Sequence, residues 1–257
     1  MNAIDLNSDL GESFGPWKMG MDAEVMKSVS SANVACGFHG GDPSVMIRTV
    51  KAASEAGVAV GAHPGHPDLQ GFGRRNMACT PDEVYANTLY QIGALRAVCA
   101  ARGVELEHVK PHGALYNQAA ADPALAAAIA RAVKDAGGDL ILLGLANSFF
   151  EGAASEAGVT FAAEAFADRG YMDDGSLVPR NRPGAFVHDL EEAGRRMVRL
   201  AREGVIQSAE GRDIRLKARS ICVHGDNPAA VEMARFIRKK LEENGVEVKR
   251  IREVLRG

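Results

Sequence analysis

The sequence is short of the features that assign some protein classes directly. It has only 4 cysteines among 257 residues and no Cys-x-x-Cys pair, a pattern typical of free thiols in a reducing cytoplasm. It has no basic run, which argues against a nucleic-acid partner, and no apolar stretch long enough to cross a membrane. Residues 1–9 lack the basic start and apolar core of a signal peptide. We therefore expect a cytoplasmic protein with no nucleic-acid or membrane partner.

Several common catalytic signatures are absent as well. The chain contains no GxxxxGK[ST], no GxGxxG after a predicted strand and no HExxH. These absences exclude a P-loop, a dinucleotide-binding fingerprint and a zincin helix. Any use of ATP must therefore depend on other residues.

What the sequence does contain is a repeated strand–helix unit. Four helix starts pair a capping residue with proline: Asp42-Pro43, Thr80-Pro81, Asp122-Pro123 and Asn227-Pro228. Glycines at 57, 103, 137, 158, 204 and 245 mark helix ends. Apolar runs between these signals predict buried parallel strands near 3–7, 32–36, 58–63, 107–111, 139–144, 159–164 and 219–224. A short run at 246–248 predicts an edge strand or an eighth strand.

Polar residues close nearly every predicted strand instead of gathering at one switch point. This distribution favours a (β/α) barrel, complete or incomplete, over an open doubly wound sheet. The chain is 46% hydrophobic, and no linker rich in Pro, Ser or charge divides it. We therefore expect residues 1–257 to form one barrel domain. The two long connections, 64–79 and 165–187, are typical of lids or binding loops.

Four of the predicted strands end in a histidine beside glycine or proline. They are His39, His63, His112 and His224. Histidine titrates near neutrality and can act as a base, an acid or a metal ligand. Because the carboxyl ends of barrel strands surround one site, the four histidines predict a shared active site. His66, His108 and His188 lack this context, and we expect surface or packing roles for them.

The first predicted strand carries an unusual row of polar residues. Asp5, Asn7 and Asp9 alternate, so they share one face of the strand. If that face points into the barrel, the three side chains need partners or water. We expect a functional role for Asp9 and a buried, hydrogen-bonded role for Asp5. For Asn7 and for Glu12, which follows in the next loop, both interpretations remain open.

A lysine stands at the end of the fourth predicted strand, in Lys110-Pro111-His112-Gly113. A buried lysine needs an anionic partner or a depressed pKa. We favour a role in stabilising negative charge on a substrate oxygen or phosphate over an internal salt bridge to Asp9 or Glu164. Tyr116 and Asn117 follow one turn later and are predicted to line the same mouth.

The later strands add further candidates. Glu164 closes a strand, and Asp168-Arg169 follow it. Arginine is suited to holding a carboxylate or phosphate, although an isolated Asp–Arg pair is more commonly a surface salt bridge. Asp226 is expected to be a loop residue and Asn227 a helix cap. Cys36 and Cys222 are expected to be small buried hydrophobic residues rather than nucleophiles.

Long ordered motifs resemble one known family, LamB/YcsF, which is known as the A subunit of prokaryotic ATP-hydrolysing 5-oxoprolinase. The resemblance runs from the first strand to the last helix. The motifs are Asp5-Leu-Asn-Ser-Asp-Leu-Gly-Glu-Ser-Phe-Gly15, Ala32-Asn-Val-Ala-Cys-Gly-Phe-His-Gly-Gly-Asp-Pro43, Gly61-Ala-His-Pro64, Pro67-Asp-Leu-Gln-Gly-Phe-Gly-Arg-Arg75, Val109-Lys-Pro-His-Gly-Ala-Leu-Tyr-Asn117, Phe166-Ala-Asp-Arg169 and Ile221-Cys-Val-His-Gly-Asp226.

The resemblance implies a distorted seven-stranded β/α barrel similar to that of polysaccharide deacetylases. It also implies ATP-dependent hydrolysis of 5-oxo-L-proline to L-glutamate, with ATP bound as Mg-ATP, and a complex with partner subunits B and C. The resemblance is compatible with ATP bound by this chain or by its partners.

Roles for single residues follow as a hypothesis. His39, His63 or His112 would activate water and move protons together with Asp9, and Lys110 would stabilise negative charge. Arg74, Arg75 or Arg169 would hold the substrate carboxylate. The predicted substrate-binding set is Asn7, Glu12, Arg74, Arg75, Tyr116, Glu164, Asp168, Arg169 and His224.

Two other functions compete with this one. The first is a metal-dependent deacetylase or amidohydrolase that binds a divalent ion through Asp9, His39 and either His63 or His224, and we rank it second. The other is a non-catalytic scaffold subunit, which would not need so many ionisable residues at strand ends.

Overall fold

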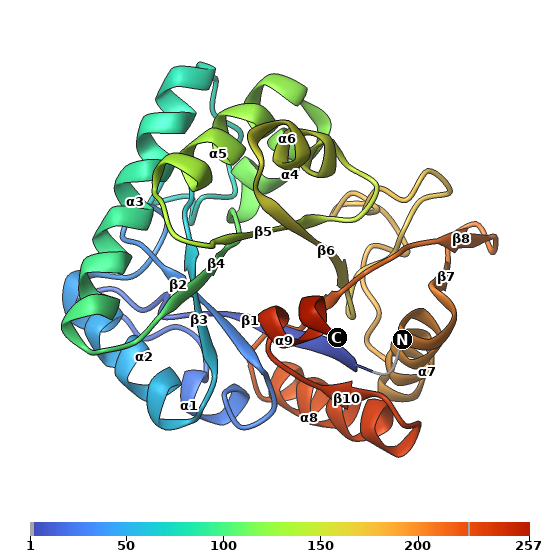
Figure 1. Cartoon of the computed structure of the whole chain (residues 1–257). Coiled ribbons are helices and arrows are strands. Elements are labelled where there is room, and N and C mark those ends of the chain that lie inside the picture. The colour runs from blue at the N-terminus through green and yellow to red at the C-terminus, as the bar shows by residue number, and fades with distance from the viewer. Residues whose placement is uncertain (1–2, 226) are drawn as a thin grey trace.

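The chain forms a closed parallel barrel in a computed structural model that describes residues 3–225 and 227–257. Asp226, predicted to be a loop residue, lies outside the described residues. In the described part, seven strands pair in the order β1-β2-β3-β4-β5-β6-β9, and β9 pairs with β1 to close the ring (Figure 1). They are β1 Ala3–Leu10, β2 Ser31–Ala35, β3 Ala59–His63, β4 Leu106–Val109, β5 Ile141–Leu145, β6 Thr160–Phe166 and β9 Ser220–Cys222.

Helices surround the barrel and cover its apolar outer face. The described helices are α1 Asp22–Val25, α2 Pro43–Glu55, α3 Pro81–Ala101, α4 Gly113–Ala121, α5 Pro123–Asp135, α6 Phe149–Ala157, α7 Leu190–Glu203, α8 Pro228–Glu243 and α9 Ile251–Arg256. The predicted caps are confirmed: the side chains of Asp42, Thr80, Asp122 and Asn227 each accept a backbone N–H at the start of a helix. Thr80 and Glu83 also form a reciprocal capping box.

The predicted barrel is confirmed, and the structure adds detail that the sequence patterns did not supply. The 246–248 run forms β10 (Glu247–Val248), which pairs with the start of β1. The fourth strand ends at Val109, so Lys110 lies just beyond it. A small antiparallel hairpin outside the barrel, β7 (Val205–Gln207) with β8 (Asp213–Arg215), was not predicted.

Alternate strand residues point into the barrel, and an unusual share of them is polar. Asn7 of β1 donates from Nδ2 to Glu164 Oε1 of β6, at 2.8 Å. His108 of β4 spans the interior to place Nε2 2.7 Å from Asn33 Oδ1 of β2. Gly61 of β3 makes room for this ring, because a Cβ there would lie 2.1 Å from His108 Nε2. The barrel therefore encloses a hydrogen-bonded interior rather than a wholly apolar one.

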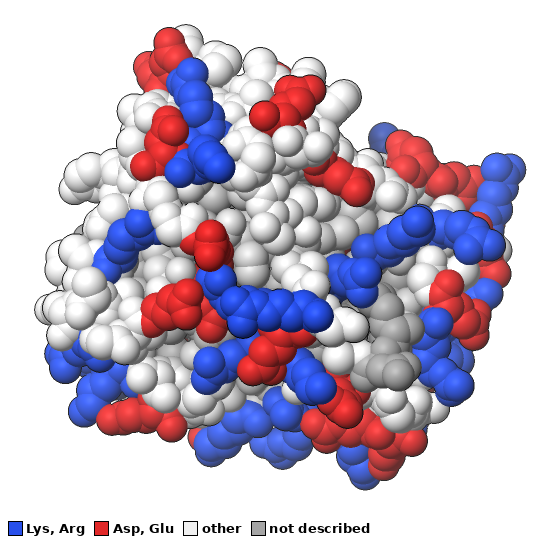
Figure 2. All heavy atoms as spheres, in the orientation of Figure 1, with Lys and Arg blue, Asp and Glu red and all other residues white. Residues whose placement is uncertain are grey.

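The amino-terminal end of the barrel is covered by the last helix. Ile251 of α9 packs in one buried cluster with Ile141, Leu143 and Ala162 from β5 and β6, and Figure 1 shows α9 at the near end of the barrel beside β10. Figure 2, from the same side, shows acidic and basic side chains interleaved on this face, as in the 3.2 Å pair of Arg252 and Glu105. No helix in the described ranges has both the length and the apolar character needed to span a bilayer.

Candidate active site

The deepest polar residues of the interior surround Asp5 and form a lower layer consisting of Asp5, Asn7, Ser30, Ser31 and Ser220. The hydroxyls of Ser30 and Ser31 donate to Asp5 Oδ1 at 2.8 and 2.6 Å, and that of Ser220 donates to Asp5 Oδ2. Burial raises the pKa of Asp5 to about 6, although the three hydroxyls oppose the shift. The predicted buried, hydrogen-bonded role of Asp5 is confirmed.

Lys110 lies above this layer and bridges two carboxylates. Its Nζ is 3.0 Å from Asp9 Oδ1, 3.0 Å from Glu164 Oε1 and 3.1 Å from Cys222 Sγ. Burial opposes the charge of Lys110, but the nearby carboxylates prevail and hold its pKa well above the ordinary value. The internal salt bridge, which the sequence ranked lower, is present with both predicted partners. Lys110 is thus a fixed cation at the centre of the barrel mouth.

Glu12, His39, His63 and His112 form an upper layer next to Asp9. His39 Nε2 lies 3.3 Å from Glu12 Oε1, and the ring of His39 stacks on that of His112 with 3.7 Å between centroids. His63 Nε2 lies 3.0 Å from His112 Nδ1 and 3.3 Å from Asp9 Oδ2. Three of the four strand-end histidines therefore meet, because they follow the adjacent strands β2, β3 and β4.

Burial shifts the pKa of Glu12, His39 and His112 in the upper layer. It lowers the pKa of His39 and His112 well below the ordinary value, and the neighbouring histidines add to that effect. It also raises the pKa of Glu12, against the opposing influence of His112. Asp9 responds differently: burial raises its pKa, but His63 and Lys110 prevail and hold it well below the ordinary value. At neutral pH Asp9 is therefore a carboxylate, and its Oδ2 lies 3.3 Å from His63 Nε2, an arrangement suited to proton transfer.

The fourth strand-end histidine, His224, lies apart from the other three. Its Nδ1 is 2.7 Å from Asp168 Oδ2, and this carboxylate outweighs burial and raises the pKa of His224. The surface salt bridge between Asp168 and Arg169, offered by the sequence as an alternative, is wrong. Arg169 is 5% exposed and donates to the backbone carbonyls of Ala185 and Val178, so it fixes the 165–187 connection.

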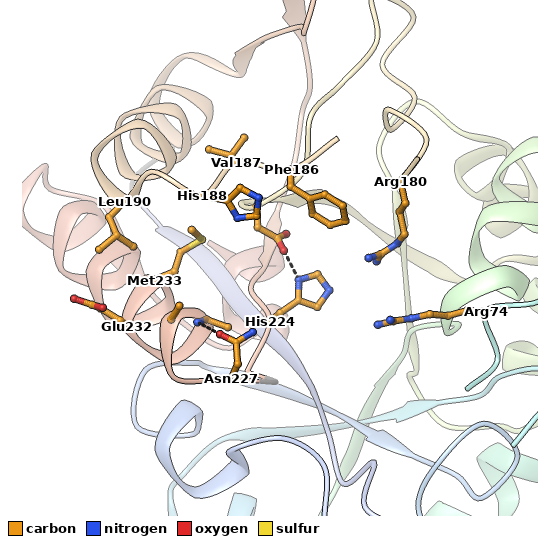
Figure 3. Close-up of a pocket in the computed structure, with 13 residues that line it drawn as sticks. Arg74, Arg180, Phe186, Val187, His188, Leu190, His224, Asn227, Glu232 and Met233 are labelled. Atoms are coloured by element: carbon orange, nitrogen blue, oxygen red, sulfur yellow. Dashed lines mark hydrogen bonds and ion pairs between the residues drawn. The ribbon is translucent and has the colours of Figure 1, made fainter. Parts of the chain in front are cut away.

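Two arginines from different loops face the mouth, and only one of them was predicted. Arg74 and Arg180 line both a chamber of about 50 Å³, which also contacts Asp9, Lys110 and His112, and an adjoining cavity of about 460 Å³. Figure 3 shows both guanidinium groups directed toward His224. Arg74 lies over the Phe72 ring and Arg180 over the Phe186 ring, at 5.0 and 5.4 Å from the ring centroids, and neither forms an ion pair with another residue that the structure describes. Arg75, predicted alongside Arg74, is instead paired with Asp68.

Other predicted residues are tied into the interior, and two contributors were missed. The Tyr116 hydroxyl donates to Glu164 Oε2 at 2.9 Å, so both belong to the wall of the mouth. Asn33 donates to Asn7 Oδ1 and Asp9 Oδ1 at 2.7 and 2.8 Å. Neither Asn33 nor Arg180 was singled out from the sequence. The alternation that identified Asn7 also marks Asn33, a polar residue within an apolar strand.

Within the described residues, two groups of side chains have metal-ligand character. One is the upper layer, and the other is Asp9, Cys222 and His224; in each, one ligand atom per residue lies within 4.8 Å of the others. The predicted set of Asp9, His39 and either His63 or His224 is thus divided between two groups. Burial raises the pKa of the Cys222 thiol well above its ordinary value despite the nearby Lys110, which agrees with the expectation that Cys222 is not a nucleophile.

Comparison with known proteins places this geometry in a wider context. A family model described as the LamB/YcsF family matches residues 4–256. The 5-oxoprolinase A subunit of Pyrococcus horikoshii is 54% identical over 253 residues, covering 98% of this chain and 99% of that protein. The protein of the same name from Coprothermobacter proteolyticus is 56% identical over 254 residues, covering 99% and 97%.

A solved structure agrees over nearly the whole barrel. The crystal structure of a "Lactam Utilization Protein" from Thermus thermophilus has a TM-score of 0.92 and 49% sequence identity with this chain. The match covers 96% of this chain and 99% of that one. The similarity therefore includes the elements that build the mouth as well as the barrel itself.

Proposed function

Because this chain belongs to the LamB/YcsF family, we propose that it acts in 5-oxoproline metabolism as the A subunit of a 5-oxoprolinase. The reaction is hydrolysis of the cyclic amide of 5-oxo-L-proline to L-glutamate, coupled to hydrolysis of ATP to ADP and phosphate. Relatives that are 54% and 56% identical over nearly their full length carry the name of this subunit. One relative of solved structure is named for lactam utilization, and 5-oxoproline is a lactam.

The observation that carries the proposal is the chamber of about 50 Å³ in which Asp9, His63, Lys110 and His112 converge. A lactam is a resonance-stabilised amide, so its opening needs an activated carbonyl, a base for water and an acid for the leaving nitrogen. Asp9 is held as a carboxylate, the neighbouring histidines supply proton-transfer groups, and Lys110 supplies a fixed positive charge. A base, proton-transfer groups and a positive charge for the carbonyl oxygen are thus available in one chamber, which supports the proposal.

ATP supplies the activation by placing a phosphoryl group on the amide oxygen. Water then adds to the amide carbon that bears this oxygen, while Asp9 accepts the proton of the water, directly or through His63. The C–N bond breaks as an imidazole delivers a proton to nitrogen, and a second water releases phosphate from the resulting acyl phosphate. Lys110 stabilises the negative charge that develops on oxygen in these steps, which is the role of a preorganised cation in a site shielded from water.

The unpaired arginines give the substrate its orientation. A guanidinium group binds a carboxylate or phosphate through paired hydrogen bonds, and Arg74 and Arg180 are placed between the chamber and the 460 Å³ cavity. We assign the substrate carboxylate to Arg74 and negatively charged groups in the larger cavity to Arg180. Phosphate oxygens of Mg-ATP are suited to the second position.

The proposal includes partners and a location. The subunit names of the relatives imply a multi-subunit complex, and we take the partners to be subunits B and C. The four cysteines are free, which supports the reducing cytoplasm predicted from the sequence.

Turnover by the assembled complex tests the proposal. The chain is mixed with subunits B and C from the same genome, 5-oxo-L-proline and Mg-ATP, and glutamate and phosphate are measured. We expect coupled release from the complex and an Asp9→Asn variant reduced by about 10² to 10⁴-fold. Asp82→Asn, at an exposed carboxylate paired with Arg131, is the matched control. Absence of release from a verified complex contradicts the proposal.

A metal-dependent deacetylase is the second candidate, and the histidine-rich upper layer is the observation that favours it. Release of acetate from acetylated sugars or amides by the isolated chain, without ATP, would support this alternative. The two activities are distinguished by their ATP requirement and by their products.

A further inference from the structure

We propose that the mouth of the barrel binds one divalent transition-metal ion of the zinc class through His63 Nε2, His112 Nδ1 and Glu12 Oε1. The site does not rest on the reaction proposed above, because metal binding is measured on the isolated chain; with an ion bound, His63 and His112 are ligands and Asp9 is left as the proton-transfer group.

The argument begins with the protons of two imidazole rings. His63 Nδ1 lies 2.7 Å from the Lys110 backbone carbonyl, and His112 Nε2 lies 2.8 Å from the Phe72 carbonyl. A carbonyl oxygen can only accept, so both of these nitrogens must carry hydrogen. A neutral imidazole has a single N–H. When both rings are neutral, the remaining nitrogens, His63 Nε2 and His112 Nδ1, each carry a lone pair, and these two atoms lie 3.0 Å apart.

Two lone pairs at this distance repel unless a cation lies between or beside them. The surrounding carboxylates add to this repulsion and favour a cation further, since Glu12 Oε1 is 3.6 Å from His112 Nδ1 and Asp9 Oδ2 is 3.3 Å from His63 Nε2. The nearby lysine does not supply this cation, because Lys110 Nζ is bonded to the other oxygen of Asp9. The upper layer thus gathers electron-pair donors without a positive charge among the contacts that the structure describes.

Two of the three separations among these ligand atoms are close to those around a small metal ion, and the third, between His63 and Glu12, is at most 4.8 Å. Zinc bonds of about 2.0–2.2 Å in a tetrahedron place neighbouring ligand atoms about 3.4 Å apart. The separations of 3.0 Å between the two ring nitrogens and 3.6 Å between His112 Nδ1 and Glu12 Oε1 lie on either side of this value. Three protein ligands leave a fourth position free, as in catalytic zinc sites, and the adjoining 50 Å³ chamber holds room for a water molecule.

The groups behind the ligands are arranged as metal sites require. Ligating histidines usually donate their second N–H to a carbonyl or carboxylate, which fixes the tautomer and the ring orientation, and both rings do so here. Phe72, whose carbonyl holds His112, has a φ of 54°, a strained value for a bulky residue. Such strain is characteristic of functional sites, and here it directs the carbonyl toward the ring.

His39 is a positioning residue in this site and not a ligand. Its ring is parallel to that of His112 within 2° at a centroid distance of 3.7 Å. An ion in the plane of His112 therefore lies well out of the plane of His39, where no lone pair points. His39 instead places Nε2 3.3 Å from Glu12 Oε1 and holds that carboxylate in place.

An additional shared proton is the competing explanation for the two facing lone pairs. It would turn one ring into an imidazolium, most readily His63, whose Nε2 lies 3.3 Å from Asp9 Oδ2. A metal ion has the opposite preference, since it binds neutral imidazole and an ionised carboxylate. When bound, such an ion lowers the pKa of a coordinated water or polarises a carbonyl.

Metal binding is measured first on the wild-type chain. The full-length protein is treated with a chelator, dialysed, and titrated with Zn²⁺ and with Co²⁺. We expect one ion per chain by elemental analysis and a rise in the melting temperature with metal. We also expect a Co²⁺ visible spectrum of low coordination number with no thiolate charge-transfer band. A thiolate band would instead place the ion at Asp9, Cys222 and His224 and overturn the assignment.

Variants then locate the ion. Glu12→Gln and His112→Asn remove ligands, and we expect each to weaken affinity by more than about 100-fold. His39→Asn removes an orienting group, for which about 10- to 100-fold is expected. His188→Asn, at an exposed histidine outside the upper layer, is the matched control and should leave affinity unchanged.

Two results would overturn the site. One is a folded, metal-free wild-type protein that takes up no ion at saturating Zn²⁺ or Co²⁺, with nitrogen NMR showing a third proton shared by His63 and His112. The other is unchanged stoichiometry and affinity in folded His112→Asn. If a variant does not fold, the wild-type stoichiometry and Co²⁺ spectrum still decide the matter.

Discussion

The two polar layers inside the barrel differ in how their hydrogen-bonding groups are matched. In the lower layer, Asp5 accepts from three serine hydroxyls, and Ser220 also accepts from Asn7. In the upper layer, His63 Nε2 faces His112 Nδ1, and carboxylate oxygens approach both. Both layers are buried and polar, so polarity alone does not distinguish structure from function. The two layers are instead distinguished by whether each acceptor is matched to a hydrogen-bond donor.

Lys110 connects the two regions, and replacing it should have the largest effect. Lys110→Met leaves Asp9 and Glu164 buried without their cation, and removing one partner of a buried pair costs about 3–5 kcal/mol. Urea unfolding measures this loss. Lys51→Met, at a surface lysine 3.7 Å from Glu55, should change stability by no more than about 0.5 kcal/mol. Equal losses from the two variants would show that the centre contributes no more than the surface.

The upper layer should affect turnover more than stability. His112→Asn removes a ring that lines the chamber, so we expect turnover of the assembled complex to fall by about 10² to 10⁴-fold whether the ring moves protons or holds a metal ion. Its urea midpoint should move less than that of Lys110→Met. The control is His66→Asn, because His66 is equally buried but contacts Gln118 outside the mouth. If His66→Asn reduces turnover as much, the contrast between the layers is lost.

The lower layer should appear in the pH dependence of stability. Burial raises the pKa of Asp5 from 3.8 to about 6, so between these values the folded chain binds more protons than the unfolded chain. The Asp5 contribution therefore destabilises the protein as pH rises from about 4 to 6. Asp5→Asn removes this component. Between pH 4 and pH 7, the unfolding free energy of the variant should therefore rise relative to that of the wild type by up to about 3 kcal/mol. Parallel curves of unfolding free energy against pH for the two proteins would contradict the raised pKa of Asp5.

A smaller effect is expected where the lower layer loses one hydroxyl. Ser220→Ala removes a donor to Asp5 and an acceptor for Asn7, and an unsatisfied buried group costs about 1–3 kcal/mol. Because the Ser220 hydrogen bond lowers the pKa of Asp5, its loss should also move the pH transition upward. Ser155→Ala, on the exposed face of α6, should leave both quantities unchanged. An unaltered pH transition in Ser220→Ala would count against the arrangement of this layer.

Much of the fold could be predicted because its signals are local. Proline after a capping residue marks the starts of α2, α3, α5 and α8, and buried apolar runs mark the barrel strands. The hairpin of β7 and β8 was missed because its short strands, Val-Ile-Gln and Asp-Ile-Arg, show no sustained alternation.

The site could be predicted only where adjacent strands supply it. His39, His63 and His112 follow β2, β3 and β4, so their meeting follows from barrel order. His224 follows β9, and its pairing with Asp168 depends on the path of the 165–187 connection. That path is fixed by hydrogen bonds from Arg169 to two backbone carbonyls, which no periodicity reveals. Arg180 was missed for the same reason.

The position of α9 has a consequence for how small molecules would reach the interior of the barrel in the proposed reaction. Ile251 packs against β5 and β6, and Asp5, Ser31 and Ser220 are fully buried beneath the 50 Å³ chamber, so in the part of the chain that the structure describes this chamber is covered from the amino end of the barrel. In the proposed reaction, substrates must then enter and products must leave through the same mouth at the carboxyl end of the barrel. A partner subunit bound over this mouth would control both substrate entry and product release without contacting the side chains of the chamber.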